Sequence, residues 1–369
     1  DNTAPIVTLT DTDADNIVKD SDAVTITATF NEAMTTAPTV SIGALVTNIA
    51  MTATASNTTW TYDWNVPAGN DGTVSATVSG TDIAGNAYAG TDSITFTIDN
   101  TPPTVTLTDT DADNVVKDSD AVTITATFNE AMTTAPTVSI GALVTNIAMT
   151  ATATNTTWTY PWNVPGGNDG TVTATVSGTD IAGNAYAGTD SITFTIDNTP
   201  PTVTLTDTDA DNVVKDSDTV TITATFNKPM TTAPTVSISG LVTNTVMTAV
   251  SSTTWTYPWN VPAGNDGDVT ATVSGSSVAG NVYAGTDSIT FTIDNTAAQI
   301  ITSTINLENS LISLQFSEGV FSNNNGSGAL DVNDFVYSIS GGTATLASTS
   351  PTSITTGASN SYVLGLSLS

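Results

Sequence analysis

The sequence has no cysteine, no histidine and no arginine, and its only basic residues are four lysines. Without Cys and His, disulfides, the usual zinc sites and the Ser-His or Cys-His nucleophile pairs are excluded. The formal net charge is −31, from 35 acidic residues against 4 basic ones. Such a chain repels phosphate groups, so we expect no nucleic-acid partner and no attachment to anionic membranes through a basic patch.

Long apolar stretches are also absent. No run reaches the roughly 18 apolar residues that a membrane-spanning helix needs, so we expect no membrane insertion in this segment. No signal peptide is visible. The chain begins at a repeat boundary and ends on Tyr362-Val363-Leu364-Gly365-Leu366, which reads as an unfinished strand. We therefore expect it to be an excerpt from a longer protein.

The dominant positive feature is internal repetition. The tripeptide Asp-Asn-Thr begins at residues 1, 99, 197 and 294, which gives periods of 98, 98 and 97 residues. A period near 100 is the size of one small domain. We predict four domains: repeat one (1–98), repeat two (99–196), repeat three (197–293) and a divergent, truncated C-terminal segment (294–369).

Within each repeat the pattern is that of β-strands. In repeat two, apolar residues alternate with threonine over 122–128, 172–176 and 192–196, and shorter candidates lie at 105–107, 138–140, 144–149 and 158–164. Alternation with a period of two indicates strands buried on one face. We predict an all-β protein made of tandem immunoglobulin-like β-sandwich domains in an extended array, each with about seven antiparallel strands. The C-terminal segment should be a related sandwich, with a Gly/Asn-rich loop at 323–328.

Each repeat also carries one dense group of carboxylates, the acidic loop (11–22, 109–120 and 207–218). Its aspartates are Asp11, Asp13, Asp15, Asp20 and Asp22; Asp109, Asp111, Asp113, Asp118 and Asp120; and Asp207, Asp209, Asp211, Asp216 and Asp218. In repeat two, the first, third, fifth and twelfth residues match the ligand spacing of an EF-hand calcium loop. Asn114 replaces the usual glycine and tolerates positive φ, whereas Lys117 weakens the match. The alternative is a solvated loop that binds nothing.

The expected chain path places the acidic loop at the C-terminal end of its sandwich, beside the linker. We therefore predict calcium (Ca2+) sites at domain junctions, with the linker aspartates Asp99, Asp197 and Asp294 as further ligands. Asp82 and Asp180 rank third, because repeat three has Ser277 at this position. Repeat three has Lys228 at the position of Glu32 and Glu130, which rules out these glutamates as essential ligands.

Aromatic rows offer a second hypothesis. Trp158, Tyr160 and Trp162 alternate along one strand, and the rows Trp60/Tyr62/Trp64 and Trp255/Tyr257/Trp259 are equivalent. An exposed row could stack on sugar rings, but a buried Trp is common in this fold, and we predict that the rows fill the core. Each carboxylate cluster lies in a repeated loop without a cleft-forming insertion, so we expect no catalytic residues and no enzyme.

Two elements resemble a known family. The opening Asp-Asn-Thr-Pro-Pro-Thr-Val-Thr-Leu at 99–107 and Asp-Ile-Ala-Gly-Asn at 180–184 are similar to bacterial immunoglobulin-like repeats of giant surface adhesins. The Thr-rich, Cys-free form is most similar to adhesins of Bacteroidetes, including the SprB-type adhesins of gliding species that the type IX system exports. The resemblance implies a cell-surface location, tandem extension and calcium at the joints.

The leading hypothesis is a calcium-rigidified stalk that contacts neighbouring repeats, projects a distal module towards an unidentified surface or glycan target, and transmits force. At about 3.3 Å per strand residue, each repeat should extend roughly 40 Å. Two alternatives remain: the repeats themselves bind glycan, or the chain associates laterally into a filament or surface layer.

Overall fold

The computed structural model describes residues 1–54, 56–322 and 328–369. Most of the predicted Gly/Asn-rich loop at 323–328 lies outside these residues. Strands dominate the described part, which has a single 3-10 turn, η1 (Val332–Asp334). No helix in the described ranges is long and apolar enough to cross a membrane. The chain divides into two units, 1–198 and 199–369.

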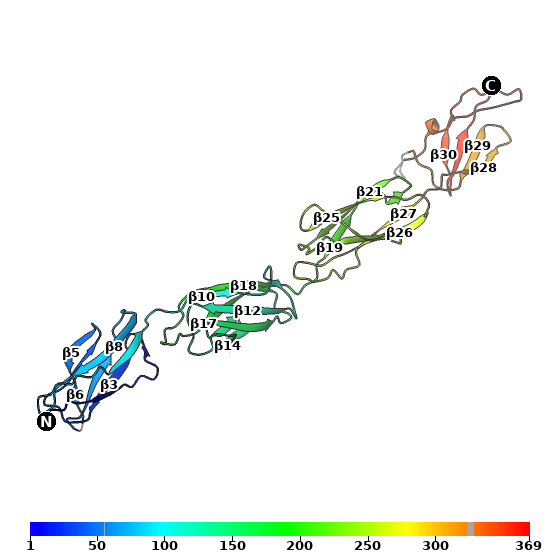
Figure 1. The fold of residues 1–369 in the computed structure, drawn as a ribbon. Coiled ribbons are helices and arrows are strands. Elements are labelled where there is room, and N and C mark those ends of the chain that lie inside the picture. Colours follow the sequence, from blue (N-terminus) through cyan, green and yellow to red (C-terminus); the bar gives the residue numbers. More distant parts are fainter. Residues whose placement is uncertain (55, 323–327) are drawn as a thin grey trace. The chain divides into compact units, whose positions relative to one another are not determined.

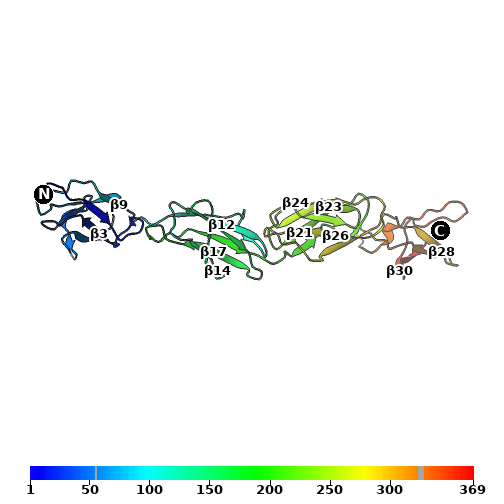
Figure 2. The same cartoon turned by 60° about the horizontal axis from the view of Figure 1, so that its bottom comes forward.

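Repeat two defines the architecture of all three repeats. Its strands are β10 (Val105–Thr108), β11 (Val115–Val116), β12 (Ala121–Phe128), β13 (Thr137–Ile140), β14 (Val144–Ala148), β15 (Thr150–Ala151), β16 (Thr157–Asn163), β17 (Gly170–Ser177) and β18 (Ser191–Ile196). One sheet has the order β10-β12-β16-β15, and the other has the order β11-β18-β17-β13-β14. The two sheets form the layers of a sandwich (Figures 1 and 2).

The other repeats have the same order of strands. Repeat one contains β1 (Val7–Thr10), β2 (Ile17–Val18), β3 (Ala23–Phe30), β4 (Thr39–Ile42), β5 (Val46–Ala50), β6 (Thr52–Ala53), β7 (Thr59–Asn65), β8 (Gly72–Ser79) and β9 (Ser93–Ile98). Repeat three contains β19 (Val203–Thr206), β20 (Val213–Val214), β21 (Thr219–Phe226), β22 (Thr235–Ile238), β23 (Val242–Val246), β24 (Thr248–Ala249), β25 (Thr254–Asn260), β26 (Gly267–Ser274) and β27 (Ser288–Ile293).

The alternation of threonine and apolar residues explains why these segments form half-buried strands. In β12, Val122, Ile124 and Ala126 are buried, while the intervening threonines face outwards. Threonine is β-branched, so it keeps a high strand propensity while its hydroxyl remains in water. The strands predicted from the alternation are present, and the all-β sandwich prediction is confirmed.

The prediction of seven purely antiparallel strands was incomplete. The structure adds short strands, among them β11, which pairs in parallel with β18 through Val115↔Thr195 and Val116↔Ile196. Asn114 and Ser119 on either side of it have φ values of 59° and 68°. These left-handed residues turn the acidic loop so that two of its residues join the second sheet. Two residues are too few for a periodic pattern, which is why the sequence did not reveal this strand.

The tryptophans lie in the core, as predicted. Trp162 is 2% exposed, and its ring packs against Phe194 with centroids 5.2 Å apart. Trp158 is buried as well, and Tyr160 packs partly buried against the same core. The equivalent residues of repeats one and three are placed alike. Buried indoles offer no face for a sugar ring, so the hypothesis of glycan binding through these rows is wrong.

One buried hydrogen bond distinguishes the repeats. The indole Nε1 of Trp158 donates to the backbone oxygen of Asn155 at 3.1 Å, and Trp60 does the same to Asn57. Repeat three has one residue fewer before Trp255, whose Nε1 is buried without a partner among the residues described. A buried donor that lacks an acceptor destabilises the fold by about 1–3 kcal/mol.

The C-terminal segment differs from the repeats. Its strands are β28 (Ile300–Ile305), β29 (Leu311–Phe316), β30 (Ile354–Thr356) and β31 (Ser361–Gly365), in the order β28-β29-β31-β30. Ile300, Ile301 and Ile305 are exposed. Within the described residues of this segment we find one sheet and no second layer, so the truncated sandwich stays a prediction.

The difference between the two tryptophans can be tested by matched substitutions. We expect Trp158→Phe to destabilise repeat two more than Trp255→Phe destabilises repeat three, by about 1–3 kcal/mol, because only the first change breaks a hydrogen bond. Hydrogen exchange of the core strands, resolved by repeat in the intact chain, measures both losses. Equal losses would contradict the assignment of the unpaired indole.

Candidate metal centre

The acidic loop is held in shape by its own aspartates. The Oδ1 atom of Asp109 accepts from the backbone N–H of Asp111 at 2.8 Å. Asp111 in turn accepts from Asp113 N at 3.2 Å and from Asn114 N at 2.6 Å. These are Asx turns, in which a short carboxylate side chain satisfies the backbone donors that follow it. The alternating aspartates therefore have a structural role independent of any ion.

The second half of the loop contains an internal positive charge. The Nζ atom of Lys117 lies 3.2 Å from the Oδ1 atom of Asp120, while the backbone N–H of Lys117 donates to Oδ2 of the same carboxylate at 2.8 Å. Lys215 and Asp218 form the equivalent pair in repeat three at 3.4 Å. In the two pairs that the structure describes, a lysine thus engages the last aspartate of the loop. This agrees with the expectation that the lysine weakens the resemblance to a calcium loop.

The predicted position of the loop beside the linker is confirmed. The backbone N–H of Asp118 donates to the Oδ1 atom of Asn198 at 2.5 Å, and Asn198 N donates to Asp169 Oδ1 at 2.9 Å. In repeat one the hydroxyl of Thr101 and the amide of Asn100 hold the pKa of Asp71 below its usual range. The loop, the turn at 168–170 that contains Asp169, and the linker thus form the C-terminal pole of repeat two, and the equivalent segments form that of the other repeats.

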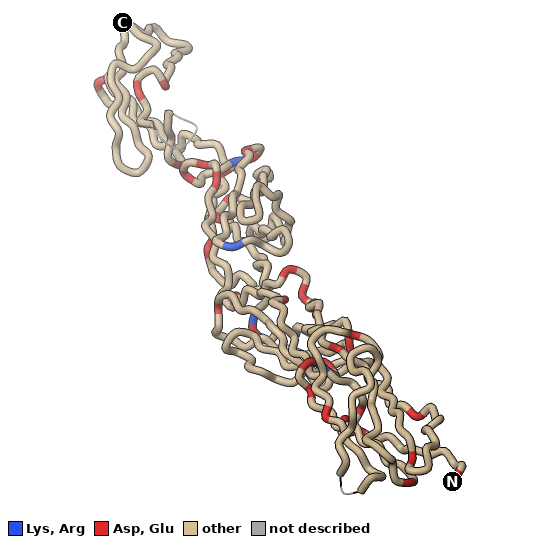
Figure 3. Tube along the Cα trace, turned by 90° about the vertical axis from the view of Figure 1, so that its left-hand side faces the viewer, with Lys and Arg blue, Asp and Glu red and all other residues tan. Residues whose placement is uncertain are grey.

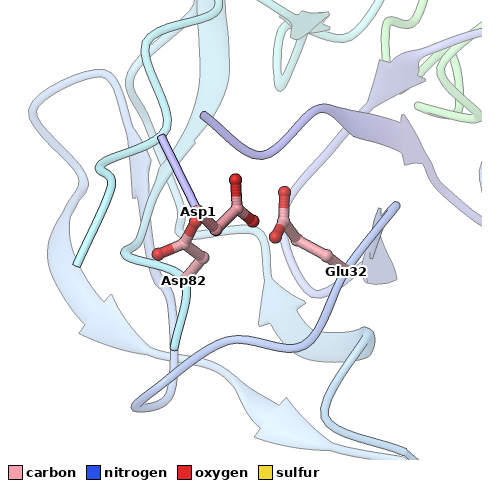
Figure 4. A group of neighbouring side chains, drawn as sticks. All are labelled: Asp1, Glu32 and Asp82. Atoms are coloured by element: carbon pink, nitrogen blue, oxygen red, sulfur yellow. The ribbon is translucent and has the colours of Figure 1, made fainter. Parts of the chain in front are cut away.

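At the opposite pole of repeats one and two, three carboxylates converge. In repeat two, Asp99, Glu130 and Asp180 can each offer an oxygen within 4.8 Å of the others. In repeat one the group is Asp1, Glu32 and Asp82, and Figure 4 shows these side chains pointing towards one another. We call these groups the pole clusters. Figure 3 shows how the acidic residues gather in loops, whereas lysines are few.

Each member of the pole cluster of repeat two comes from a different part of the repeat. Asp99 follows β9 and donates its backbone N–H to Val18 O at 2.8 Å. Glu130 lies two residues after the end of β12, and Asp180 forms an isolated bridge with Met132. The fold therefore brings together three carboxylates that are distant in sequence.

Asp180 is the anchor of the cluster. Its side chain is almost fully buried, and it accepts from Asn184 N at 2.8 Å and from Asn184 Nδ2 at 2.9 Å. The same Nδ2 group donates to the backbone oxygen of Asp99 at 2.9 Å, which ties the linker to this pole. In repeat one, the hydrogen bonds from Asn86 hold the pKa of Asp82 below its usual range. These hydrogen bonds favour the charged form of Asp82.

Glu130 is affected in the opposite direction. Burial, followed by repulsion from Asp99 and Asp180, raises its pKa above the usual range. A carboxylate in this position is stabilised when a cation neutralises the group. Calcium takes six to eight hard oxygen ligands, and carboxylates with backbone carbonyls are the donors that it prefers. The chemistry of the donor set thus fits a divalent cation.

The structure ranks the acidic residues differently from the sequence. Of the predicted ligands, Asp99 lies in a pole cluster. Its partners are Asp180, which we ranked third from the sequence, and Glu130, which we had ruled out as an essential ligand. In repeat one the group includes Glu32, which we had ruled out in the same way, and Asp1, which the sequence did not suggest. The acidic-loop aspartates (Asp11, Asp13, Asp15, Asp20, Asp22, Asp109, Asp111, Asp113, Asp118, Asp120, Asp207, Asp209, Asp211, Asp216 and Asp218) belong to neither three-carboxylate group of the described chain. Their role as ligands stays a prediction.

Repeat three retains one feature that supports the acidic loop. Asp209, Asp211 and Asp218 line an open hollow of about 330 Å³ together with Lys215. Burial, together with the neighbouring Asp211, raises the pKa of Asp209. The backbone hydrogen bonds to Asp209 act in the opposite direction. The loop therefore has some of the character of a cation site, in addition to its Asx turns.

The two remaining linker aspartates have different surroundings. Asp197 donates its backbone N–H to Val116 O at 2.8 Å. Asp294 does the same to Val214 O at 2.9 Å, and its carboxylate lies beside Glu318, two residues after the end of β29. Burial and then Asp294 raise the pKa of Glu318. One sequence signal could have pointed to these glutamates. A Phe-x-Glu motif recurs at the ends of β3, β12 and β29, with the Phe as the last strand residue and the Glu two residues beyond it.

The comparisons identify the family. The model of the bacterial Ig-like domain family (group 3) matches residues 58–146 and 156–302, which is more than half of the chain. The chain therefore belongs to the bacterial immunoglobulin-like domains of group 3. No curated protein matches the sequence.

Three solved structures illustrate the similarity. A 1.5-MDa bacterial ice-binding adhesin is 24% identical with a TM-score of 0.47, covering 80% of this chain and 100% of that one. A Ca2+-stabilised adhesin with which an Antarctic bacterium binds ice is 21% identical with a TM-score of 0.40, covering 100% and 92%. The I9–I11 tandem of titin is 12% identical with a TM-score of 0.30, covering 78% and 100%.

The raised pKa of Glu130 predicts a pH dependence. An acid whose pKa is higher in the folded state than in the unfolded chain stabilises the fold below its unfolded pKa, about 4.3, and this stabilisation is lost as pH rises through the folded pKa. In chelator, repeat two should therefore lose stability as pH rises above about 4.3. Glu130→Gln should remove this loss, whereas Glu308→Gln, at an exposed position, should keep it. Thermal melts across this range, followed by hydrogen exchange per repeat, make the measurement, and identical profiles for both variants would contradict it.

Proposed function

We propose that this chain is a calcium-rigidified stalk segment of a bacterial surface adhesin, which holds a distal binding module away from the cell and transmits force to it. The family supplies the class of domain, and the tandem repeats supply a spacer. The observation that carries the proposal is the pole cluster of three carboxylates, Asp99, Glu130 and Asp180, together with its equivalent in repeat one.

The cluster would act as a clamp on the linker. Asp99 belongs to the linker, Glu130 to the end of β12, and Asp180 to a buried loop. A cation held by all three would attach the linker to repeat two at several points. Removing it would leave three negative charges in contact, which repel one another. Pro102 and Pro103 support stiffness independently, because proline fixes φ and restricts the preceding residue.

The acidic loop is the second proposed site. Its aspartates at the C-terminal pole, with Asp197 and Asp294 as linker ligands, would bind calcium beside the next domain. Its Asx turns already hold the loop in shape, so an ion here would add less order than at a pole cluster. We therefore assign the main mechanical role to the pole clusters.

The adhesins among the similar structures accord with an extracellular, cell-surface location and a non-enzymatic role. From the resemblance of the repeat sequences we further propose that the chain belongs to a gliding-motility adhesin of Bacteroidetes that is exported by the type IX system. Lateral self-association stays an alternative, and concentration-dependent sedimentation tests it.

Calcium removal from the intact chain tests the proposal. At about 100 times its Kd, an ion that binds only the folded state stabilises it by about 2.7 kcal/mol. For a domain of this size, this amounts to a rise of about 10–20 °C in Tm. We expect chelator to lower Tm by this amount and to shorten the maximum dimension measured by small-angle scattering. If neither quantity changes, the calcium mechanism is wrong.

A pair of double variants assigns the ion to its site. Glu32→Gln with Glu130→Gln removes a charged ligand from each pole cluster, whereas Asp13→Asn with Asp111→Asn removes charge from two acidic loops. Asparagine keeps the Oδ1 acceptor of the Asx turns, so the loop variant should fold. We expect the glutamate pair to abolish most of the calcium-dependent gain in Tm and the loop pair to keep most of it. The reverse result would transfer the clamp to the acidic loop.

A further inference from the structure

Repeat three departs from the pole cluster at two positions at once. Lys228 stands where repeats one and two have Glu32 and Glu130, and Ser277 stands where they have Asp82 and Asp180. The other three lysines of the chain occupy equivalent positions in the three acidic loops. Lys228 is thus the only lysine without a counterpart in another repeat, and it lies at a cluster position.

The two replacements together change the summed formal charge at these three sequence positions. In repeat two, Asp99, Glu130 and Asp180 sum to −3. In repeat three, the residues at the equivalent sequence positions, Asp197, Lys228 and Ser277, carry −1, +1 and 0, which sum to 0. Replacing the glutamate by lysine alone would have left a sum of −1, so both changes are needed for neutrality.

The backbone frame of the pole is unchanged. Met230 forms an isolated bridge with Ser277, as Met132 does with Asp180. Ser277 is almost fully buried like Asp180, and its Oγ atom accepts from Asn281 N at 3.3 Å. A neutral hydroxyl therefore replaces the buried carboxylate within the same loop.

Lys228 places its ammonium group at the linker. It lies two residues after the end of β21, and its Nζ atom donates to the backbone oxygen of Thr199 at 2.8 Å and contacts the hydroxyl of Thr199. Thr199 is two residues from Asp197 in the sequence. A lysine ammonium is a compact point charge with three donors, and it binds carbonyl and hydroxyl oxygens as a hard metal ion does.

A second change stiffens the same pole. Pro229 replaces the alanine of repeats one and two, and its backbone oxygen accepts from Val278 N at 3.1 Å. This bond attaches the segment after β21 to the loop that carries Ser277. Proline also lowers the conformational freedom of the unfolded chain. Both effects hold the pole together without an ion.

We infer that Lys228 takes the place of the metal in repeat three, so that this repeat closes its N-terminal pole with its own ammonium group while repeats one and two need a cation. The inference rests on the proposed function. It divides one stalk into joints that respond to calcium and a joint that does not.

Hydrogen exchange of the full chain in calcium and in chelator tests this. In the wild type, segments 128–134 and 178–186 should exchange about 100-fold more slowly at a calcium concentration about 100 times the Kd. Segments 226–232 and 275–283 should exchange equally in both. Lys228→Glu combined with Ser277→Asp should give repeat three the same calcium protection. The reciprocal pair, Glu130→Lys with Asp180→Ser, should remove it from repeat two.

The outcomes separate the inference from the proposed function. Equal calcium protection at the poles of all three wild-type repeats, or no gain in the first double variant when its other strands exchange normally, would overturn the inference. If no pole responds to calcium, the proposed function fails. A single variant tests the lysine itself. The inference requires that Lys228→Met speed up exchange at 226–232, both in calcium and in chelator. The control variant Lys215→Met should leave exchange at 226–232 unchanged. If the first double variant does not fold, the reciprocal pair decides.

Discussion

Repulsion between carboxylates that the fold forces together is the constraint on which the rest of this structure depends. The chain carries a formal charge of −31, and each pole cluster brings three carboxylates within 4.8 Å of one another, at the N-terminal poles of repeats one and two. The hydrophobic cores make this possible, because the Trp/Phe packing fixes the strands that the loops with these acids connect. On the proposed function, the stability of each pole depends on what neutralises this charge.

The linker aspartate connects this electrostatic problem with mechanics. Asp99 continues the last strand of repeat one through its bond to Val18, and its side chain belongs to the cluster of repeat two. Asp294 likewise follows the last strand of repeat three, β27, bonds through its backbone N–H to Val214, and has its carboxylate beside Glu318 of the next segment. On the proposed function, a residue placed between two repeats would pass a change in the charge of the cluster to the linker.

The three repeats differ in the charge of their N-terminal poles. Repeats one and two differ at seven positions and keep the acids of the cluster. Repeat three changes Glu to Lys and Asp to Ser while its core, its Met-Ser bridge and its acidic loop persist. The pole is therefore variable in charge within a constant frame, which is what a family of joints with different ion requirements would need.

The strands and the burial of the tryptophans could be predicted from the sequence, because alternation with a period of two encodes which side chains face the core. The repeat boundaries that we predict come from the recurring Asp-Asn-Thr. It also placed the acidic loop beside the linker. Only the tertiary structure decided which acids meet: Asp99, Glu130 and Asp180 are separated by up to about eighty residues, and no local pattern joins them. The acidic loop was predicted as the main site because its charges are adjacent in sequence. In the structure, several of its aspartates accept hydrogen bonds from their own backbone in Asx turns. The short parallel strand β11 could not be predicted from the sequence either, because two residues show no periodic pattern and their partner strand, β18, lies at the other end of the repeat.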